Sequence, residues 1–460
     1  MELRKIYRIV ITISLVSSLC AGCNLKRTTD QSNNQAVTSS PSQAPSQAPS
    51  QAPLVLDQKQ ATNQTRDQEE QSIQFWYSYE DDSAKEMMIQ LIDLFEIENA
   101  YVNVKLRGFP SNSYDQILAD AQLNGNVPDL VMNDSSTVWV RAQQGTIINL
   151  QSRVERDNIK LNHYFPVLMN RGTYLQDVYA MPFDSEVQVL YYNKKMFRNA
   201  GLVQESPSAS WIDLEKQMDT LNALYDKKNT MMIRVSSVIN NLPHWSWAWL
   251  NGVDFGNDGN PRYVTSNNIE ALQWVINKRF EYPDIQTQMD NMRQLEDHGK
   301  LYLEGKIPVL LADSSFYKFV QYRQADADLA VSTSPYHQQR SSWTTSRGLE
   351  IMNSGELDQQ EAAWELMKFL IRKDTQIFIH RQIGSLISHI GAATFPEFIE
   401  DPIWAEIVDQ MNFSSFVKEV AYSPNISAEI SDVFDEAFKG VIQAREALTQ
   451  VQELTSASKK

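Results

Sequence analysis

The first part of the chain alternates between short apolar runs and longer stretches with helical spacing. Residues 72–77 (SIQFWY) are apolar and aromatic and predict a strand, and residues 101–106 alternate like a second strand. Between them, Asp82 or Ser83 is expected to cap a helix whose apolar face contains Met87, Leu91, Ile92 and Phe95. Strands that alternate with helices predict a parallel sheet covered by helices.

The same pattern continues downstream. A helical stretch over residues 114–123 leads to a third predicted strand at residues 129–132. Residues 181–193 alternate around Val187, Val189 and Tyr191, as expected of a strand that leaves one lobe and enters another. The order predicts an α/β architecture in which ligands gather at the carboxyl ends of strands.

Two later helices are predicted from their apolar stripes. Asn267 and Glu270 have the spacing of a capping box, which would open a helix that buries Ala271, Leu272, Val275 and Ile276. A final helix is expected from near Ser427, with a buried stripe formed by Val433, Phe434, Ala437, Phe438, Val441 and Leu448. Trp211, Trp274 and Trp364 fall on helical stripes and are expected in the core.

The amino terminus has a different character. Basic residues precede an apolar stretch at residues 9–19, which is too short to span a bilayer, and Ala21 and Gly22 lead into Cys23. This order resembles the bacterial lipoprotein signal, although Leu19 stands one position earlier than that pattern places its Leu. The resemblance implies a signal peptide over residues 1–22 and acylation of Cys23, for example by palmitate, which anchors the protein to the membrane.

Residues 23–71 are rich in Ser, Gln, Ala and Pro and contain SQAP three times, a composition that cannot bury a core and predicts a disordered linker. Cys20 and Cys23 are the only cysteines, so a chain cleaved after Gly22 keeps no pair for a disulfide. The net charge of −16 argues against nucleic acid or an anionic membrane surface as a partner.

The usual signatures of enzymes and cofactor sites are missing from the sequence. There is no phosphate-binding loop, no dinucleotide fingerprint, no HExxH and no GxSxG, and the six histidines lack metal-ligand spacing. Residues 254–260 look like a calcium loop, but Gly256 replaces an oxygen ligand, so a turn is the better interpretation. We therefore expect no catalytic residue, no cofactor and no metal.

Several segments together resemble one family. Residues 179–202 (YAMPFDSEVQVLYYNKKMFRNAGL), 127–150 (VPDLVMNDSSTVWVRAQQGTIINL) and 361–371 (EAAWELMKFLI) are similar to segments of family 1 extracellular solute-binding proteins, the sugar-binding components of ATP-driven importers. The resemblance implies the two-lobed type II periplasmic-binding-protein fold, with an interlobe cleft and crossing hinge strands. It places lobe 1 at residues 72–183, lobe 2 at 184–346, a return to lobe 1 at 347–390 and a helical part of lobe 2 at 391–460.

Sugars have apolar faces that stack on aromatic rings and hydroxyls that need carboxylates, amides or Arg as partners. We therefore expect the ligand to be bound by rings and polar groups that follow strands or lie at the two crossings. These candidates are Trp76, Tyr77, Tyr79, Asp134, Trp139, Asp184, Glu186, Trp245, Trp247, Trp249, Phe316, Trp343 and Arg347.

Several of these candidates also have a structural alternative. Trp76 and the three tryptophans at positions 245, 247 and 249 could pack in a lobe core, and Asp134 could cap a helix. Asp184 and Glu186 lie two residues apart and could form a solvated hinge.

Three functions fit this pattern. The first is a monomeric, lipid-anchored receptor on the outer face of the cytoplasmic membrane, in a Gram-positive bacterium, that binds an oligosaccharide and delivers it to permease subunits of an ABC transporter. The second is a surface glycoside hydrolase with Asp184 and Glu186 as its two carboxylates. The third is a sugar-sensing subunit for a membrane histidine kinase.

Overall fold

The computed structural model describes residues 70–79, 81–202, 207–226, 248, 250–253, 262–281, 295–324, 327–354, 356–416 and 424–457. Its strands are β1 (Gln71–Tyr77), β2 (Val102–Gly108), β3 (Leu130–Asp134), β4 (Thr173–Tyr174), β5 (Asp177–Val178), β6 (Met181–Asn193), β7 (Val309–Asp313), β8 (Leu329–Ser332), β9 (Ser342–Ile351), β10 (Leu386–Ile387) and β11 (Ser414–Ser415). The strands predicted at residues 72–77, 101–106, 129–132 and 181–193 are confirmed as β1, β2, β3 and β6.

Helices alternate with these strands through most of the chain. They are α1 (Asp82–Glu98), α2 (Ser111–Leu123), α3 (Val138–Gln144), α4 (Gln151–Arg156), α5 (Pro166–Arg171), α6 (Lys194–Asn199), α7 (Trp211–Asp226), α10 (Ser266–Glu281), α12 (Leu295–Leu303), α13 (Ser315–Arg323), α14 (Leu357–Ile371), α15 (Lys373–Ile383), α16 (Ile390–Ala393), α17 (Pro396–Ile399), α18 (Pro402–Gln410), α19 (Pro424–Phe438) and α20 (Ala444–Ala457). Among the described residues, no helix is long and apolar enough to cross a membrane.

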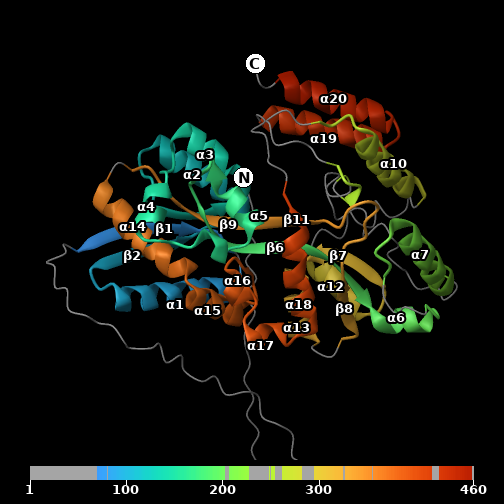
Figure 1. Ribbon diagram of the computed structural model, residues 1–460, viewed down its shortest axis with the longest axis horizontal. Helices are drawn as coiled ribbons and strands as arrows, with labels where there is room; N and C mark the ends of the chain where they lie inside the picture. The colour runs from blue at the N-terminus through green and yellow to red at the C-terminus, as the bar shows by residue number, and fades with distance from the viewer. Residues whose placement is uncertain are drawn as a thin grey trace, which may run out of the picture. The chain divides into compact units, whose positions relative to one another are not determined.

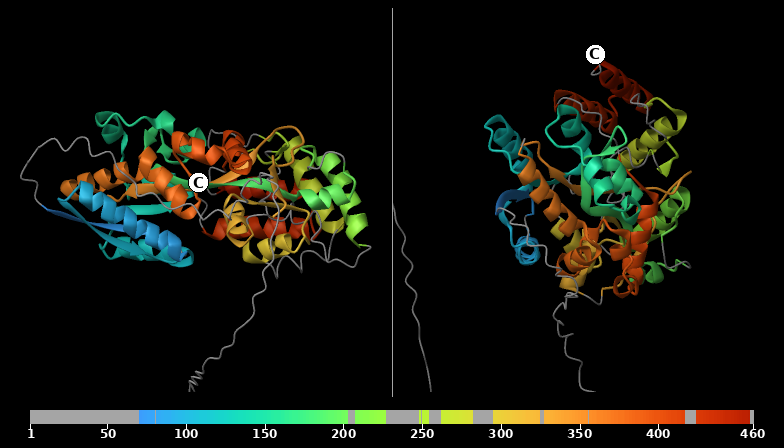
Figure 2. Two further views of the ribbon diagram at one scale, coloured as in Figure 1. Left: turned by 90° about the horizontal axis from the view of Figure 1, so that it is seen from below. Right: turned by 60° about the vertical axis from the view of Figure 1, so that its left-hand side comes forward.

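The strands of lobe 1 form one mixed layer. Their order is β10-β6-β9-β3-β1-β2, with β1 parallel to both β2 and β3, and β9 antiparallel to both β3 and β6. Helices α1, α14 and α15 pack together over this sheet (Figure 1), and Figure 2 gives two further views of the same packing. The apolar stripe predicted for α1 is buried as expected, but its cap is Asp81, whose carboxylate accepts from Ser83 N, and not Asp82 or Ser83.

Strand β6 belongs to both lobes. Its first half pairs with β9 and β10 in the sheet of lobe 1, whereas its second half lies between β7 and β8, which are the strands of lobe 2. Strand β9 passes from a pairing with β11 at Ser342 and Trp343 to a pairing with β3 at its other end. One hydrophobic core cluster continues along this connection, from Ile73 and Phe75 in lobe 1 to Tyr302 and Phe316 in lobe 2.

The carboxyl-terminal helix differs from the prediction. Two helices, α19 and α20, replace the single expected helix and pack beside each other and against α10 (Figure 1). Gly440 lies between them with φ +73°, a left-handed conformation that ends a helix, so Val441 is exposed and not buried as expected. Ala437 and Leu448 are fully buried, and they belong to a cluster that α19 and α20 share with α10.

The amino terminus of α10 also corrects a prediction. The side chains of Asn267 and Glu270 do not form a capping box, because both bond to Asn251. Thr265 Oγ1 instead accepts a hydrogen bond from Asn268 N at 3.2 Å. The predicted stripe of Ala271, Leu272, Val275 and Ile276 is nevertheless buried.

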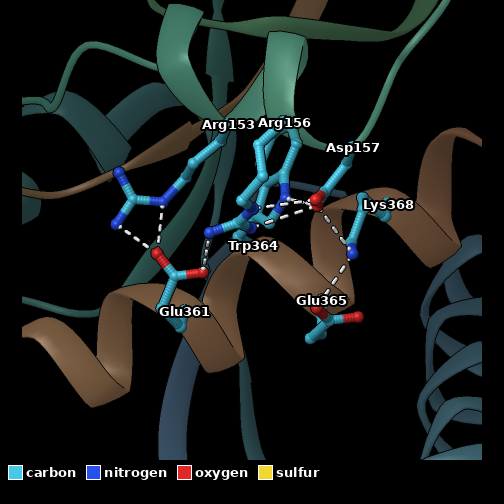
Figure 3. A network of polar contacts seen from close by, with 7 residues as sticks. All are labelled: Arg153, Arg156, Asp157, Glu361, Trp364, Glu365 and Lys368. Carbon is cyan, nitrogen blue, oxygen red and sulfur yellow. Dashed lines mark hydrogen bonds and ion pairs between the residues drawn. The ribbon is translucent and has the colours of Figure 1, made fainter.

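The helix tryptophans lie in or against cores, as expected. Trp211 is buried and stacks on Trp274 with ring centroids 4.6 Å apart. Trp364 of α14 is fully buried, and its indole Nε1 donates to Asp157 at 2.6 Å. Figure 3 shows Asp157 at the centre of a network that joins α4 to α14 and contains Arg153, Arg156, Asp157, Glu361, Trp364, Glu365 and Lys368.

Candidate ligand-binding site

Three of the predicted site residues lie side by side across three strands. Arg347 on β9 is directly opposite Asp184 on β6, and on its other side it is opposite Asp134 at the end of β3. Residues directly opposite one another project on the same face of a sheet. The register therefore brings together Asp134, Asp184 and Arg347, although 163 residues separate Asp184 from its Arg partner.

Asp184 is held by donors on both of its oxygens. Arg347 Nε donates to Oδ1 at 2.9 Å, while Oδ2 accepts from Arg347 Nη2, from the Tyr79 hydroxyl at 2.8 Å and from Ser385 Oγ at 3.2 Å. The guanidinium carbon of Arg347 also lies 4.1 Å from the centre of the Tyr79 ring, within cation–π range. With its acceptor positions occupied, Asp184 orients Arg347 and Tyr79 and is not available as a free acceptor.

Exposure along β9 alternates and identifies the open side of the site. Trp343, Thr345 and Arg347 are partly exposed, whereas the residues between them are buried. On β6, Glu186 is opposite Thr345 and is also partly exposed, although both of its neighbours on the strand are buried. We refer to Glu186, Trp343, Thr345 and Arg347 as the open face, because their side chains share one side of the paired strands.

Electrostatics distinguish Glu186 from its neighbours. Burial raises the pKa of Glu186 to about 8, and the negative charges of Asp313 and Asp184 act in the same direction against the opposing effect of Arg347. Burial is the largest single effect on Arg347 and disfavours its charged form, but the charge and hydrogen bonds of Asp184, together with Tyr79 and Glu186, outweigh burial and raise the pKa of the guanidinium. Burial also raises the pKa of Tyr79 well above its usual value.

These ionisation states give the open face mixed hydrogen-bonding capacity. Near neutral pH a protonated Glu186 both donates and accepts, Arg347 only donates, and Thr345 does either. Trp343 adds an aromatic ring beside them. A ring next to donors and acceptors suits a ligand with apolar faces and hydroxyl edges.

Three other candidates lie in cores and not on the open face. Trp76 is 5 % exposed and packs on Phe109 with ring centroids 4.8 Å apart, which is the core alternative considered for it. Tyr77 is buried in the main core cluster of lobe 1. Phe316 is fully buried and packs on Tyr191 at 4.8 Å, because α13 turns it inward from the end of β7.

The two candidates that follow β3, Asp134 and Trp139, differ in their surroundings. Asp134 is exposed, and its Oδ1 accepts from Ser136 N at 2.7 Å, so it caps the short turn Ser135–Thr137 as the alternative proposed. Trp139 on α3 is partly exposed, and its buried indole Nε1 has no hydrogen-bond partner within the described residues. Trp245, Trp247 and Trp249 lie outside the described residues, as do residues 254–260.

Two further residues at the site, Gln188 and Ser385, are not among those predicted from the sequence. Gln188 continues the alternation of Asp184 and Glu186 along β6, is 9 % exposed, and has an Oε1 with no hydrogen-bond partner within the described part of the chain. Gln188 lies two residues after Glu186, and this spacing indicates that the two side chains share one face of the strand. Ser385, which bonds to Asp184, follows α15 in the sequence and carries no comparable signal. In the same described ranges, no group of three His, Cys, Asp or Glu residues could hold a metal ion.

Comparison with known proteins places this geometry in a family. The model of bacterial extracellular solute-binding proteins matches residues 90–406. The sugar-binding protein MalE from Xanthomonas citri superposes with a TM-score of 0.71 at 18 % identity, over 84 % of this chain and 98 % of that one. The cyclic alpha-maltosyl-1,6-maltose binding protein from Arthrobacter globiformis gives a TM-score of 0.68 at 18 % identity, over 84 % and 98 %.

A sequence relative points the same way. The multiple sugar-binding protein of Streptococcus mutans is 29 % identical over 145 residues, which is 31 % of each chain. The structural likeness confirms the predicted α/β architecture and two-lobed periplasmic-binding-protein fold. The family model covers residues 90–406, which is more than half of the chain. The chain therefore belongs to the bacterial extracellular solute-binding proteins, which bind solutes outside the cytoplasm and are not enzymes.

Proposed function

We propose that this protein binds a carbohydrate, and more specifically an oligosaccharide, between its two lobes and delivers it to the permease subunits of an ABC transporter. The proposal is supported by solved structures of the same fold whose names specify maltose-type sugars as ligands. The glycoside hydrolase alternative is wrong, because the family consists of binding proteins.

The observation that carries the proposal is the open face of the crossing strands. A ligand there contacts β6 and β9, the strands that both lobes share, so its binding energy acts where the lobes connect. Trp343 would stack on a pyranose face, and Glu186, Thr345 and Arg347 would bond to its hydroxyls. We extend the site to Trp139 and to the tryptophans at positions 245, 247 and 249.

Sugar titration of a Trp343 variant tests this site. We expect Trp343→Ala to weaken the affinity for the best oligosaccharide at least tenfold, because the ring is a central aromatic contact. Isothermal titration calorimetry over a panel of oligosaccharides measures it. Tyr322→Ala is the matched control, since Tyr322 is an exposed aromatic on α13 outside the open face. No binding by any sugar, or equal losses in the two variants, would contradict the proposal.

We also propose that Cys23 is acylated and that residues 23–71 form a linker that keeps a monomeric binding protein near its permease, on the outer face of a Gram-positive membrane. Labelling with radioactive palmitate checks the anchor. Cys23→Ser should abolish the label and release the protein into the medium with its sugar affinity unchanged. Continued membrane retention of Cys23→Ser would refute the anchor without affecting the sugar proposal.

A further inference from the structure

A lysine that follows the strands of lobe 2 lies against lobe 1. Lys318 is on α13, directly after β7, whereas Gly384 connects α15 to β10 in the sheet of lobe 1. A Cβ atom added to Gly384 would stand 3.0 Å from Lys318 Cδ, 3.3 Å from its Cγ and 3.6 Å from its Cβ. The aliphatic part of the lysine therefore packs on the backbone of the other lobe.

Each side of this contact is fixed within its own lobe. On α13, Phe316 is fully buried, and the Tyr317 hydroxyl donates to Asp401, the N-cap residue of α18, which packs against β8. In lobe 1, Gly384 has φ +61° and ends α15, a left-handed conformation that favours glycine. A movement of one lobe relative to the other would therefore make or break the contact of Lys318.

The contact is next to the proposed binding site. Ser385, which follows Gly384, donates to Asp184 at 3.2 Å. On the other side, α13 begins just after Asp313, whose charge acts on Glu186 of the open face. The lysine thus joins the two lobes beside the open face, where closure would cover a bound ligand.

The charge of Lys318 is partly buried and has no partner. Among the described residues, no carboxylate forms an ion pair with its ammonium group. Burial lowers the pKa of Lys318, and the charge of Asp81, at the start of α1 in lobe 1, opposes this effect. Hydrogen bonds from Ser83 lower the pKa of Asp81 most, and the charge of Lys318 acts in the same direction against burial.

A second titratable group of lobe 1 is close to the lysine but does not compete with Asp81. Burial lowers the pKa of His380, and the charge of Lys318 acts in the same direction. The His380 ring is therefore neutral near pH 7. A desolvated charge without a partner is unfavourable, so Lys318 gains free energy when Asp81 approaches it.

We propose that Lys318 holds the two lobes together over the bound sugar, by packing on Gly384 and by forming an ion pair with Asp81 as the lobes close. The cross-lobe contact stands by itself, whereas its effect on sugar exchange rests on the proposed function. Because the ion pair forms only when the lobes lie together, it slows the release of the ligand more than its entry.

A disulfide staple tests the contact without any sugar. The separation of 3.6 Å between the two Cβ positions is within the range of about 3.5–4.5 Å found in disulfides. With Cys20 and Cys23, the only native cysteines, replaced by Ser, Lys318→Cys combined with Gly384→Cys should lose both free thiols on mild oxidation. Lys306→Cys with Gly384→Cys is the matched control and should keep them, because the ion pair of Lys306 is within lobe 2. Thiols that remain in the first pair, or that disappear in both, would overturn the contact.

The staple also tests the effect on sugar exchange. Maltotriose, cellotriose and mannotriose are the probes, and stopped-flow tryptophan fluorescence measures their dissociation. Oxidation of the staple after loading should slow dissociation about tenfold, and dithiothreitol should restore the rate. An unchanged rate in the oxidised protein would refute the closing role. No binding of any oligosaccharide to the unmodified protein would instead refute the proposed function, and the thiol result would still decide the contact.

Neutral substitutions separate the ion pair from the packing. Lys318→Met keeps an unbranched side chain, and Asp81→Asn keeps an N-cap residue for α1. Each should speed sugar dissociation about threefold, and the double variant should be no faster than either, because both changes remove the same pair. Lys318→Arg should keep the slow rate. Effects that multiply in the double variant, or fast dissociation from Lys318→Arg, would contradict the ion pair.

Discussion

Two polar clusters of lobe 1 are built from similar parts but differ in how fully their charges are compensated. In the Asp157 network of Figure 3, every acid faces a cation, and Arg156 donates to both Asp157 and Glu361. At the crossing strands, Arg347 is committed to Asp184, and Glu186 is left beside two further carboxylates. The first cluster joins two helices, and the second retains unsatisfied hydrogen-bonding capacity where a ligand is expected.

Solvent exposure separates the clusters in the same way. The side chain of Asp184 is 2 % exposed, whereas those of Asp157, Arg156 and Glu361 are 20 %, 49 % and 43 % exposed. Exposed ion pairs contribute little to stability, while loss of one partner from a buried pair leaves a charge without compensation. The difference predicts how each cluster responds to substitution.

The largest effect is expected from Asp184→Asn. It leaves the Arg347 guanidinium without its carboxylate, and we expect a loss of about 2–3 kcal/mol in the free energy of unfolding, at the low end for buried pairs because Arg347 is 30 % exposed. Urea denaturation measures it. Asp157→Asn is the matched control and should cost no more than about 1 kcal/mol. Equal costs would remove the distinction between the clusters.

The second expectation is that the contributions of Glu186 and Asp157 to stability depend on pH in opposite directions. The folded-state pKa of Glu186 is raised to about 8, so its contribution is full below the ordinary value of 4.5 and is lost as pH rises through about 8. The melting temperature of Glu186→Gln, relative to that of the unmodified protein, should therefore increase as pH rises from 5 to 8.5. Melting temperatures at constant ionic strength test this, and a difference that does not change with pH would contradict it.

The contribution of Asp157 to stability should instead be lost as pH falls. Hydrogen bonds from Arg156, then from Trp364 and Lys368, lower its pKa against the opposing effect of burial. A lowered folded-state pKa contributes stability above the ordinary value of 3.8 that is lost as pH falls. The melting-temperature difference caused by Asp157→Asn should accordingly shrink on acidification below about pH 4, and one that grows there would show the opposite linkage.

The smallest effect is expected from Arg156→Gln. Because this side chain is about half exposed, the substitution should cost about 0.5 kcal/mol in low salt and less in 1 M sodium chloride, where exposed charges are screened. Urea denaturation at both salt concentrations measures it. Arg198→Gln, which breaks a comparably exposed pair with Asp328, should behave alike. A cost above about 2 kcal/mol would mean that the network is more than a set of surface pairs.

The sequence predicted the strands well but located only part of the site. β6 was recognised from its alternation, which is a local property of residues 181–193. The opposition of Asp184 and Arg347 depends on the register of β6 with β9, which local patterns do not encode. Likewise, both sides of β1 are covered, so alternation could not tell that Trp76 enters one core while Tyr79 reaches Asp184.

The errors at helix ends have a common physical cause. Thr265, Asn267 and Asn268 all have side chains that can act at an N-cap, and the contact of Asn267 with Asn251 decided which one does. Gly440 permits either a helix interior or a left-handed terminus. The packing of α20 against α10 favoured the second. In both places distant contacts chose between local conformations of similar energy.

The sharing of β6 between lobes also has a consequence for biosynthesis. Strand β6 is synthesised before β7 and β8, but its partners in lobe 1, β9 and β10, leave the ribosome only after them. The sheet of lobe 1 therefore stays incomplete until Leu386 and Ile387 have been made. Such late long-range pairing slows folding. Most of the chain can thus be translated, and remain competent for export, before its amino-terminal half closes.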